Sequence, residues 1–284
     1  MIRKDLHEEN RLAWNEATHA HNSHKADQAR FLREGGSTLF PEETKLLGDI
    51  QGLSLVHLQC NSGQDSLSLA QAGAHVTGVD ISDTAIAFAR ALAQESGIPA
   101  TFVRRDIYDW FEDAARGGKS YDIVFCSYGV VWWLSDLRAW ARGIAGVLNP
   151  GGRFILVDFH PVVMTFNSQW MHTYPYFSAG HIVTRKMGVT DYVVRCKALA
   201  HSGFVEGMKD FQNPHRCHQF IWGIGEILST LLEVGLTITT FEEYPYFNGC
   251  SVFEGMREGP GKRLFPPDQV PNLPLMYGIV MQKV

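Results

Sequence analysis

The stretch from Leu53 to Asp80 constrains the fold of this chain more than any other. An apolar run ends at Leu58, small residues follow up to Gly63, a helical pattern comes next, and a second apolar run ends on Asp80. The order strand, tight loop, helix, strand predicts a right-handed βαβ unit with a carboxylate at the tip of its second strand. Such a unit offers helix N-terminal amides and an acid to the polar ends of an adenosine-containing ligand.

The rest of the chain repeats this alternation of apolar strands and helical patterns. It predicts an α/β fold with a doubly wound, mostly parallel sheet, because strands joined by helices lie parallel and are covered on both faces. We expect one or two amphipathic helices within residues 5–33, interrupted by His19–His24, and a helix from Pro41 to about Gly52. The seven expected strands are residues 53–58, 76–79, 100–104, 121–126, 154–159, 236–243 and 277–283.

Four segments follow from these patterns. Residues 1–50 are an N-terminal helical lid, residues 51–160 the first part of the α/β core, residues 161–217 an inserted substrate cap, and residues 218–284 the rest of the core. The cap lacks a clear period and is rich in aromatic residues and glycine; one strand is plausible at 191–198. A long Pro/Gly-rich loop before the last strand is expected to be functional or mobile.

Composition narrows the class of partner. The 284 residues carry a net charge of -5, with 45% hydrophobic residues. Binding to nucleic acid or to an anionic membrane draws on clustered Lys and Arg, so we expect a small-molecule substrate, no nucleic acid and no membrane. The five cysteines are scattered without paired spacing, which favours a reducing, cytoplasmic location. Nothing in the sequence indicates an oligomeric state.

Four motifs in the predicted core carry a family resemblance. They are the loop HLQCNSGQDS after the first strand, Asp80 after the second, the pair Asp106-Ile107 after the third, and the NPGG turn at residues 149–152. In this order and spacing the chain resembles the class I S-adenosylmethionine-dependent methyltransferases over roughly residues 50–160 and 218–284. The resemblance implies a seven-stranded Rossmann-like sheet with its last strand antiparallel, S-adenosyl-L-methionine as cofactor, and methyl transfer as the activity.

The resemblance also implies cofactor contacts at particular positions. Asp80 would bind the two ribose hydroxyls with Ile81 beside the adenine, while Asp106 would accept from the adenine amino group and Ile107 would pack on the ring. The residues expected near the methionine part or the methyl donor are Gln59, Asn61, Ser62, Gly63, Ser127 and Tyr128.

The first loop departs from the family pattern. His57, Gln59 and Asn61 stand where the family has an acid and two glycines, and only Gly63 of the glycine set remains. Two hypotheses stay open: the Gln59 or Asn61 side chain replaces the acid by hydrogen bonding, or the site no longer binds the cofactor.

Catalysis in this family depends chiefly on alignment, because the methyl group is already activated on a sulfonium. Alignment contributes roughly 7–11 kcal/mol, whereas a general base adds about 3–5 kcal/mol. A base is therefore optional. The candidates for it are His160, after the fifth strand, and the cap residues His172, Tyr174, Tyr176 and His181. His160 and Tyr128 are the predicted catalytic residues. A plain turn residue before Pro161 is the competing interpretation of His160.

The aromatic, nearly neutral cap favours a small apolar or aromatic substrate, with oxygen as the first choice of acceptor atom and nitrogen or sulfur open. The expected substrate contacts are Trp132, Trp133, His172, Tyr174 and Tyr176. Trp132 and Trp133 are equally compatible with packing on the sheet.

The histidines at 19, 21 and 24 form either a solvated helix end or part of a lid over the cofactor. No metal is expected there or at the segment HRCH, because the ligand spacing of known zinc sites is missing.

Two other functions remain as alternatives. A nicotinamide-dependent oxidoreductase is disfavoured, because Gln59, Asn61 and Gln64 leave no glycine fingerprint for a pyrophosphate. A non-catalytic module that retains the cofactor is the second alternative.

Overall fold

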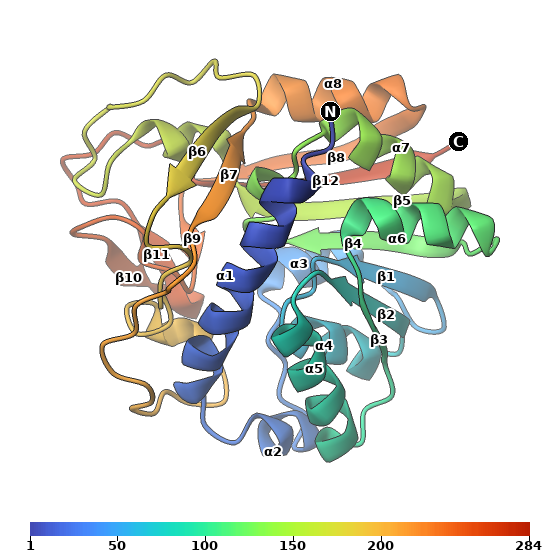
Figure 1. Cartoon of the computed structure of the whole chain (residues 1–284), viewed down its shortest axis with the longest axis horizontal. Helices are drawn as coiled ribbons and strands as arrows, with labels where there is room; N and C mark the ends of the chain where they lie inside the picture. Colours follow the sequence, from blue (N-terminus) through green and yellow to red (C-terminus); the bar gives the residue numbers. More distant parts are fainter.

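The computed structural model describes residues 1–284 and is built around one seven-stranded sheet (Figure 1). The strand order is β3-β2-β1-β4-β5-β12-β8. Only β12 runs antiparallel to its neighbours β5 and β8, as the family resemblance implied. The strands are β1 Ser54–Leu58, β2 His75–Asp80, β3 Thr101–Arg104, β4 Tyr121–Ser127, β5 Leu148–Phe159, β8 Leu236–Tyr244 and β12 Met276–Lys283.

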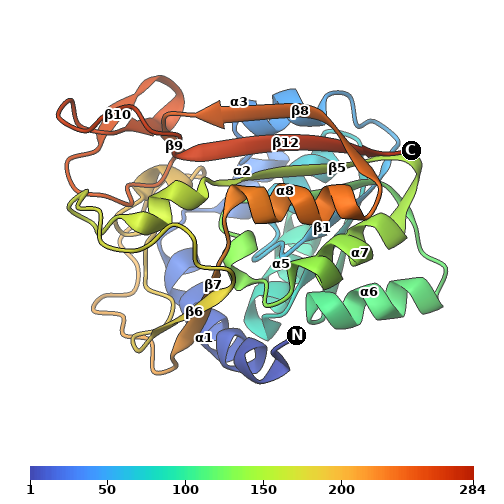
Figure 2. The ribbon, with the colours of Figure 1, turned by 90° about the horizontal axis from the view of Figure 1, so that it is seen from above.

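Both faces of the sheet are covered by helices, which explains the unbroken apolar character of its central strands. Along β4, Val124 and Cys126 belong to one buried cluster, whereas Ile123 and Phe125 belong to another on the opposite face. Figure 2 shows α6, α7 and α8 along one face; α3 and α4 contribute to the other. The helices are α3 Pro41–Leu47, α4 Gln64–Gln71, α5 Asp83–Ser96, α6 Ile107–Arg116, α7 Leu137–Val147 and α8 Ile224–Glu233.

The NPGG segment lies inside β5 as an irregularity instead of preceding the strand as a separate turn. Tyr121 pairs with Leu148 and Ile123 pairs with Arg153, so the register shifts between these two pairs. Gly151 has a φ of 76°, a conformation that glycine adopts without the steric cost of a Cβ. The strand therefore begins earlier than the apolar pattern indicates.

The N-terminal segment forms α1 (Lys4–Ser23) and α2 (Gln28–Arg33). The expected interruption at His19–His24 is wrong for most of its length, because α1 continues to Ser23. This part of the chain has no Gly or Pro to end a helix. Ala13, Ala17 and Ala20 give α1 a buried face of small residues, and Figure 1 shows the helix crossing beside the sheet and α5.

The insertion is held by a two-stranded antiparallel pair, β6 (His181–Arg185) and β7 (Cys217–Ile221). The expected strand at 191–198 is wrong: residues 191–196 are turn and coil, and Lys197–Leu199 form a short 3₁₀ turn. Because β7 spans the expected boundary at residue 217, the cap extends to Ile221.

The long loop before the last strand also has structure of its own. It contributes a small three-stranded sheet, β9 (Phe247–Asn248), β10 (Arg257–Gly259) and β11 (Arg263–Phe265), in the order β10-β11-β9. None of the helices combines the length and the apolar character that crossing a bilayer requires.

Candidate active site

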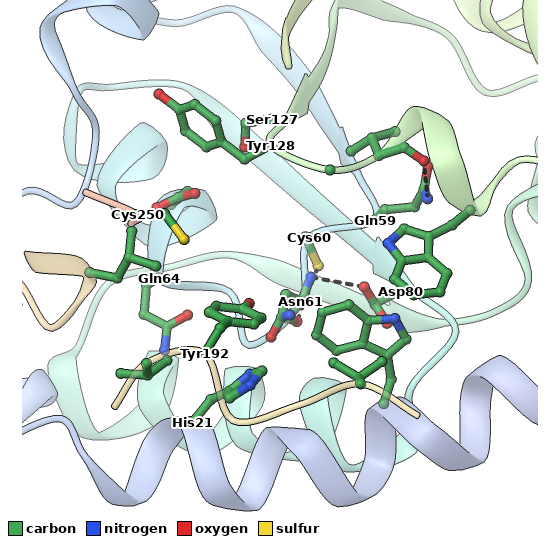
Figure 3. A pocket seen from close by; sticks show the side chains of 18 of the residues that line it. His21, Gln59, Cys60, Asn61, Gln64, Asp80, Ser127, Tyr128, Tyr192 and Cys250 are labelled. Atoms are coloured by element: carbon green, nitrogen blue, oxygen red, sulfur yellow. Dashed lines mark hydrogen bonds between the residues drawn. The ribbon is translucent and has the colours of Figure 1, made fainter. Parts of the chain in front are cut away.

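A cavity of about 610 Å³ opens at the carboxyl ends of the sheet strands (Figure 3). Its walls come from all four parts of the chain: the N-terminal helices, the core loops, the cap and the loop after β8. The predicted gathering of Asp80 and Asp106 at one rim, beside an aromatic hollow, is confirmed. The predicted site residues that line the cavity are Gln59, Asn61, Asp80, Ile81, Asp106, Ile107, Ser127, Tyr128, Trp132 and Trp133.

Asp80 ends β2 and is held by backbone amides on both sides. Its Oδ2 accepts from the amide of Asn61 and its Oδ1 from the amide of Ser82, each at 2.8 Å. Burial raises the pKa of the carboxyl, and these amides oppose the shift. Each oxygen accepts one hydrogen bond here and has capacity for another, so the carboxylate fits a vicinal diol.

The loop after β1 keeps a glycine-like backbone without the glycines. Gln59 and Asn61 have φ values of 55° and 48°, in the left-handed region. The Asn61 side chain stabilises this turn, since its Oδ1 accepts from the amide of Ser62 at 2.6 Å. The two substitutions therefore preserve the course of the loop.

Ser62 and Gly63 do not line the cavity, contrary to the prediction. Ser62 is buried, and its Oγ accepts from Nδ2 of Asn22 at 2.9 Å. Gly63 is required for packing: a Cβ on it would lie 2.7 Å from Cβ of Ala89 and 2.8 Å from the Phe102 ring. The loop thus turns these two residues toward α1 and α5.

Asp106 caps α6 and at the same time anchors α1. Its Oδ1 accepts from the amide of Tyr108 at 2.9 Å and from Nζ of Lys4 at 2.6 Å. Its Oδ2 lies 2.7 Å from Nδ1 of His7. Burial opposes ionisation, but the hydrogen bonds and charges of His7 and Lys4 outweigh it and lower the pKa of Asp106 to about 2. An adenine amino group would have to share this carboxylate with α1.

The sequence analysis missed an acid and a cation in the cavity, Asp65 and Lys25. Asp65 lies in the first turn of α4, and its Oδ1 accepts from Oγ1 of Thr38 at 2.5 Å. Burial raises the pKa of Asp65, opposed by Thr38 and Lys25. Burial lowers the pKa of Lys25 to about 8. Asp65 belongs to the motif HLQCNSGQDS, directly after the loop. That position could have identified it from the sequence as a candidate site residue.

Two of the three N-terminal histidines tie α1 to the cap. His21 lines the cavity, and its Nε2 lies 2.9 Å from the carbonyl oxygen of Thr190. Nε2 of His24 lies 2.8 Å from Oδ2 of Asp191. His19 is exposed. The helix end therefore faces the cap rather than solvent at two of the three positions.

His160, predicted as a catalytic residue, does not line the cavity. Its Nδ1 accepts from the amide of Val162 at 3.2 Å, at the start of the 3₁₀ turn Pro161–Thr165. Its Nε2 lies 3.2 Å from Oε1 of Glu243. The competing interpretation, a turn residue before Pro161, describes this geometry.

His172, Tyr174 and Tyr176, predicted as substrate contacts, are also absent from the cavity wall. His172 and Tyr174 are exposed. Tyr176 packs outward, where its Oη accepts from the amide of Ile224 at 3.1 Å. The composition of the cap indicated an aromatic lining but carried no information on which aromatic residues face inward.

Trp132 and Trp133 have a position that agrees with either interpretation from the sequence, and contact with substrate stays a prediction. They line the cavity while packing on other rings. Trp132 stacks on Phe159 with ring centroids 5.3 Å apart, and Trp133 meets Trp14 edge-on at 5.6 Å.

Comparison with known proteins agrees with this architecture. Residues 56–152 match a family model described as a methyltransferase domain. A ubiquinone biosynthesis O-methyltransferase of Methylobacterium sp. (strain 4-46) is 32% identical over 117 residues, 41% of this chain and 45% of that protein. An S-adenosyl-L-methionine-dependent Diels-Alderase of Talaromyces variabilis is 34% identical over 119 residues, 41% of this chain and 40% of that protein. The chain thus spans about half the length of the curated relatives it matches.

Solved structures extend the similarity of fold beyond the matched residues. An S-adenosylmethionine-dependent methyltransferase from Mesorhizobium loti aligns with a TM-score of 0.56 at 20% identity, over 88% of this chain and 99% of that one. Together with the strand order, this shows that the chain has the fold of S-adenosylmethionine-dependent methyltransferases, and residues 56–152 are similar to a methyltransferase domain.

Proposed function

We propose that this protein transfers a methyl group from S-adenosyl-L-methionine to a small apolar or aromatic molecule. The observation that carries the proposal is the single cavity in which Asp80, Asp106 and Asp65 share a wall with Tyr128, Trp132 and Phe159. An adenosyl amino acid needs acids for its hydroxyl and amino groups, and an aromatic hollow next to it suits a flat apolar acceptor.

The polar groups of the cavity fit both ends of this cofactor. Asp80 has acceptor capacity for the ribose hydroxyls, beside Ile81. At the amino-acid end we assign the ammonium group to Asp65 and the carboxylate to Lys25, which forms no ion pair in the protein. Asp65 would then bind the amino group in place of the family acid, whose position His57 occupies. Neither Gln59 nor Asn61 is needed for that contact.

When bound, the cofactor supplies a methyl carbon; the acceptor's lone pair bonds to it while the carbon–sulfur bond breaks and its electron pair stays on sulfur. The protein's own contribution is alignment and exclusion of water. The walls from α1 and the cap serve the second purpose, in keeping with a lid role for residues 1–50. Oxygen remains the first choice of acceptor, supported by the similarity to an O-methyltransferase.

One comparison favours a second candidate, use of the cofactor without methyl transfer. The Diels-Alderase relative is named as dependent on S-adenosyl-L-methionine, but its named reaction is not a methyl transfer. An oxidoreductase has less support, because the side chains of Gln59 and Asn61 stand where a nicotinamide fingerprint needs glycines.

Calorimetry with S-adenosylmethionine, S-adenosylhomocysteine and NAD tests the proposal, followed by a methyl-transfer panel of phenols, amines and thiols. We expect binding of the two sulfur ligands, no binding of NAD, and transfer to at least one phenol. Binding without transfer to any acceptor would favour the second candidate, and binding of NAD alone would refute the proposal.

A further inference from the structure

The cap and the segment after α1 are hydrogen-bonded into one unit at the cavity. Nε2 of His24 lies 2.8 Å from Oδ2 of Asp191. The amide of Ala26 donates to the carbonyl oxygen of Gly203 at 2.8 Å, and the amide of Val205 donates to the carbonyl oxygen of His24 at 2.9 Å. The two segments therefore form one wall of the cavity.

Lys25 and Tyr192 have corresponding places in this unit, and both line the cavity. Lys25 follows His24 in the chain and Tyr192 follows Asp191, so the contact between His24 and Asp191 keeps the two residues at the same end of the cavity. The ring of Tyr192 lies 4.1 Å from that of His21 between centroids, and Figure 3 shows these two rings beside α1. The tyrosine is thus held by the N-terminal helix as well as by the cap.

Neither of these two side chains has a polar partner in the protein. The hydroxyl of Tyr192 and the ammonium group of Lys25 form no hydrogen bond or ion pair. Neither polar atom is fully enclosed by the protein, so a ligand in the cavity can reach both. Burial raises the pKa of Tyr192, which stays protonated, and lowers the pKa of Lys25 only to about 8, which leaves it mostly charged at pH 7. This end of the cavity offers a hydrogen-bond donor and a cation.

The other basic residues of the cavity wall are three arginines, Arg105, Arg185 and Arg195. Arg105 pairs with Asp113, and Nε of Arg185 donates to Oε1 of Gln219 at 2.6 Å. Arg195 is exposed, and a charge that stays in water binds an oppositely charged group only weakly. The lysine is therefore the cation of the wall that is both partly buried and unpaired.

Asp65 supplies the opposite charge at the same end of the cavity. Its charge opposes the effect of burial on the pKa of Lys25 and adds to the effect of burial on the pKa of Tyr192, so the three side chains lie near one another. An α-amino acid carries its ammonium group and its carboxylate on one carbon, and it needs an acid beside a cation or donor. The arrangement therefore fits the amino-acid end of the cofactor better than an acceptor with a carboxylate alone.

We propose that Tyr192 is a cofactor-binding residue whose hydroxyl donates to the methionine carboxylate beside Lys25, so that the cap selects for ligands with a free carboxylate. The two oxygens of a carboxylate accept from the hydroxyl and from the ammonium group at the same time. The inference rests on the proposed function and extends it, because it adds a direct contact from the cap to the cofactor.

Calorimetry with two ligands tests this contact. The ligands are S-adenosylhomocysteine and its decarboxylated analogue, which has a hydrogen atom in place of the carboxylate. We expect the wild type to bind S-adenosylhomocysteine about a hundredfold more tightly, about tenfold for each of the two contacts to the charged group. Tyr192→Phe keeps the ring beside His21 and should lower this preference about tenfold, while its affinity for the decarboxylated ligand stays at the wild-type value.

Lys25→Met removes the cation and should also lower the preference about tenfold. Tyr174 and Lys197 provide matched controls in the cap, since both are exposed and neither lines the cavity. Tyr174→Phe and Lys197→Met should therefore keep the wild-type preference for the ligand with the carboxylate.

Two results for Tyr192→Phe would overturn the inference. One is an unchanged preference for the carboxylate, and the other is an equal loss of affinity for both ligands, which would show that the hydroxyl serves the shape of the cavity instead. The wild type keeps the two levels apart. If it binds neither ligand, the proposed function is refuted, whereas equal binding of both ligands refutes only the carboxylate site.

Discussion

Gln59 and Asn61 hold a backbone conformation that is costly for residues with a side chain. Left-handed φ values of 55° and 48° cost of order 1–3 kcal/mol each unless the surroundings compensate. Asn61 recovers part of this cost through its own turn, and its amide donates to Asp80 at 2.8 Å. The loop therefore retains its shape because it serves Asp80, and the strain is consistent with a ligand-binding function.

Asp80→Asn should weaken binding of S-adenosylhomocysteine at least tenfold. The Asn side chain retains one acceptor oxygen, but its NH2 group faces a backbone N–H, of Asn61 or Ser82, and two donors cannot bond to each other. The substitution also removes the negative charge that strengthens hydrogen bonds from ribose hydroxyls. Titration calorimetry measures the change. Asp83→Asn is the matched control at the same end of the sheet, because Asp83 is half-exposed, pairs with Arg104 and does not line the cavity. Equal affinities for the two variants would contradict the assignment.

Helix α1 forms hydrogen bonds and ion pairs with the rest of the molecule at both ends and in its middle. Lys4 and His7 contact Asp106 at one end, and His24 contacts Asp191 at the other. Between them, Nδ2 of Asn10 donates to the carbonyl oxygen of His218 at 2.9 Å and its Oδ1 accepts from the amide of the same residue at 2.6 Å. The helix thus connects the part of the cavity around Asp106 with the cap.

Asp106→Asn should reduce stability at neutral pH and remove part of the acid sensitivity of the fold. The pKa of Asp106 in the folded protein is about 2, below the value of about 3.9 in an unfolded chain. Its contribution is fully present above the unfolded value and is lost as the pH falls toward the folded one. The difference in urea midpoint between variant and wild type should therefore shrink as the pH falls below about 4, and most of it should be lost only near pH 2.

Asp109→Asn is the control for that series. Asp109 also pairs with Lys4, at 2.7 Å, but it is more exposed than Asp106 and does not contact His7. It should change stability by no more than about 1 kcal/mol. A constant difference between Asp106→Asn and wild type at every pH would show that the carboxylate contributes nothing as a charge.

Local pattern predicted the core and failed in the cap for a physical reason. Strands such as β4 are buried on both faces, so their apolar run is visible in the sequence without knowledge of partners. The cap is ordered by contacts between residues far apart in the chain, as between His24 and Asp191, which leave no local period. The same limit placed His160 and Tyr176 at the cavity, because a position near a strand end or in an aromatic segment does not determine which way a side chain turns.

At the scale of the whole molecule, the cavity has walls on several sides because four parts of the chain meet around it. Nε2 of Gln64 in the core donates to Oδ1 of Asn22 at 2.9 Å and to Oε1 of Gln28 at 2.7 Å, which joins α4 to the N-terminal segment. The cap adds Tyr192, whose ring lies 4.1 Å from that of His21. A ligand that contacts all of these walls would make their separation less favourable, because its contacts are lost when the walls separate.

Hydrogen exchange tests whether the walls act together. With S-adenosylhomocysteine at about 100 times its dissociation constant, amides that exchange only through opening of the cavity should slow by up to about 100-fold, equivalent to about 2.7 kcal/mol. We expect this protection at residues 19–33 and 186–202, as well as in the loop after β1. Helix α8 does not line the cavity and is the internal control. Protection confined to the core loops would show that α1 and the cap do not close over the ligand. A wall that opens independently of the ligand is not stabilised when the ligand binds.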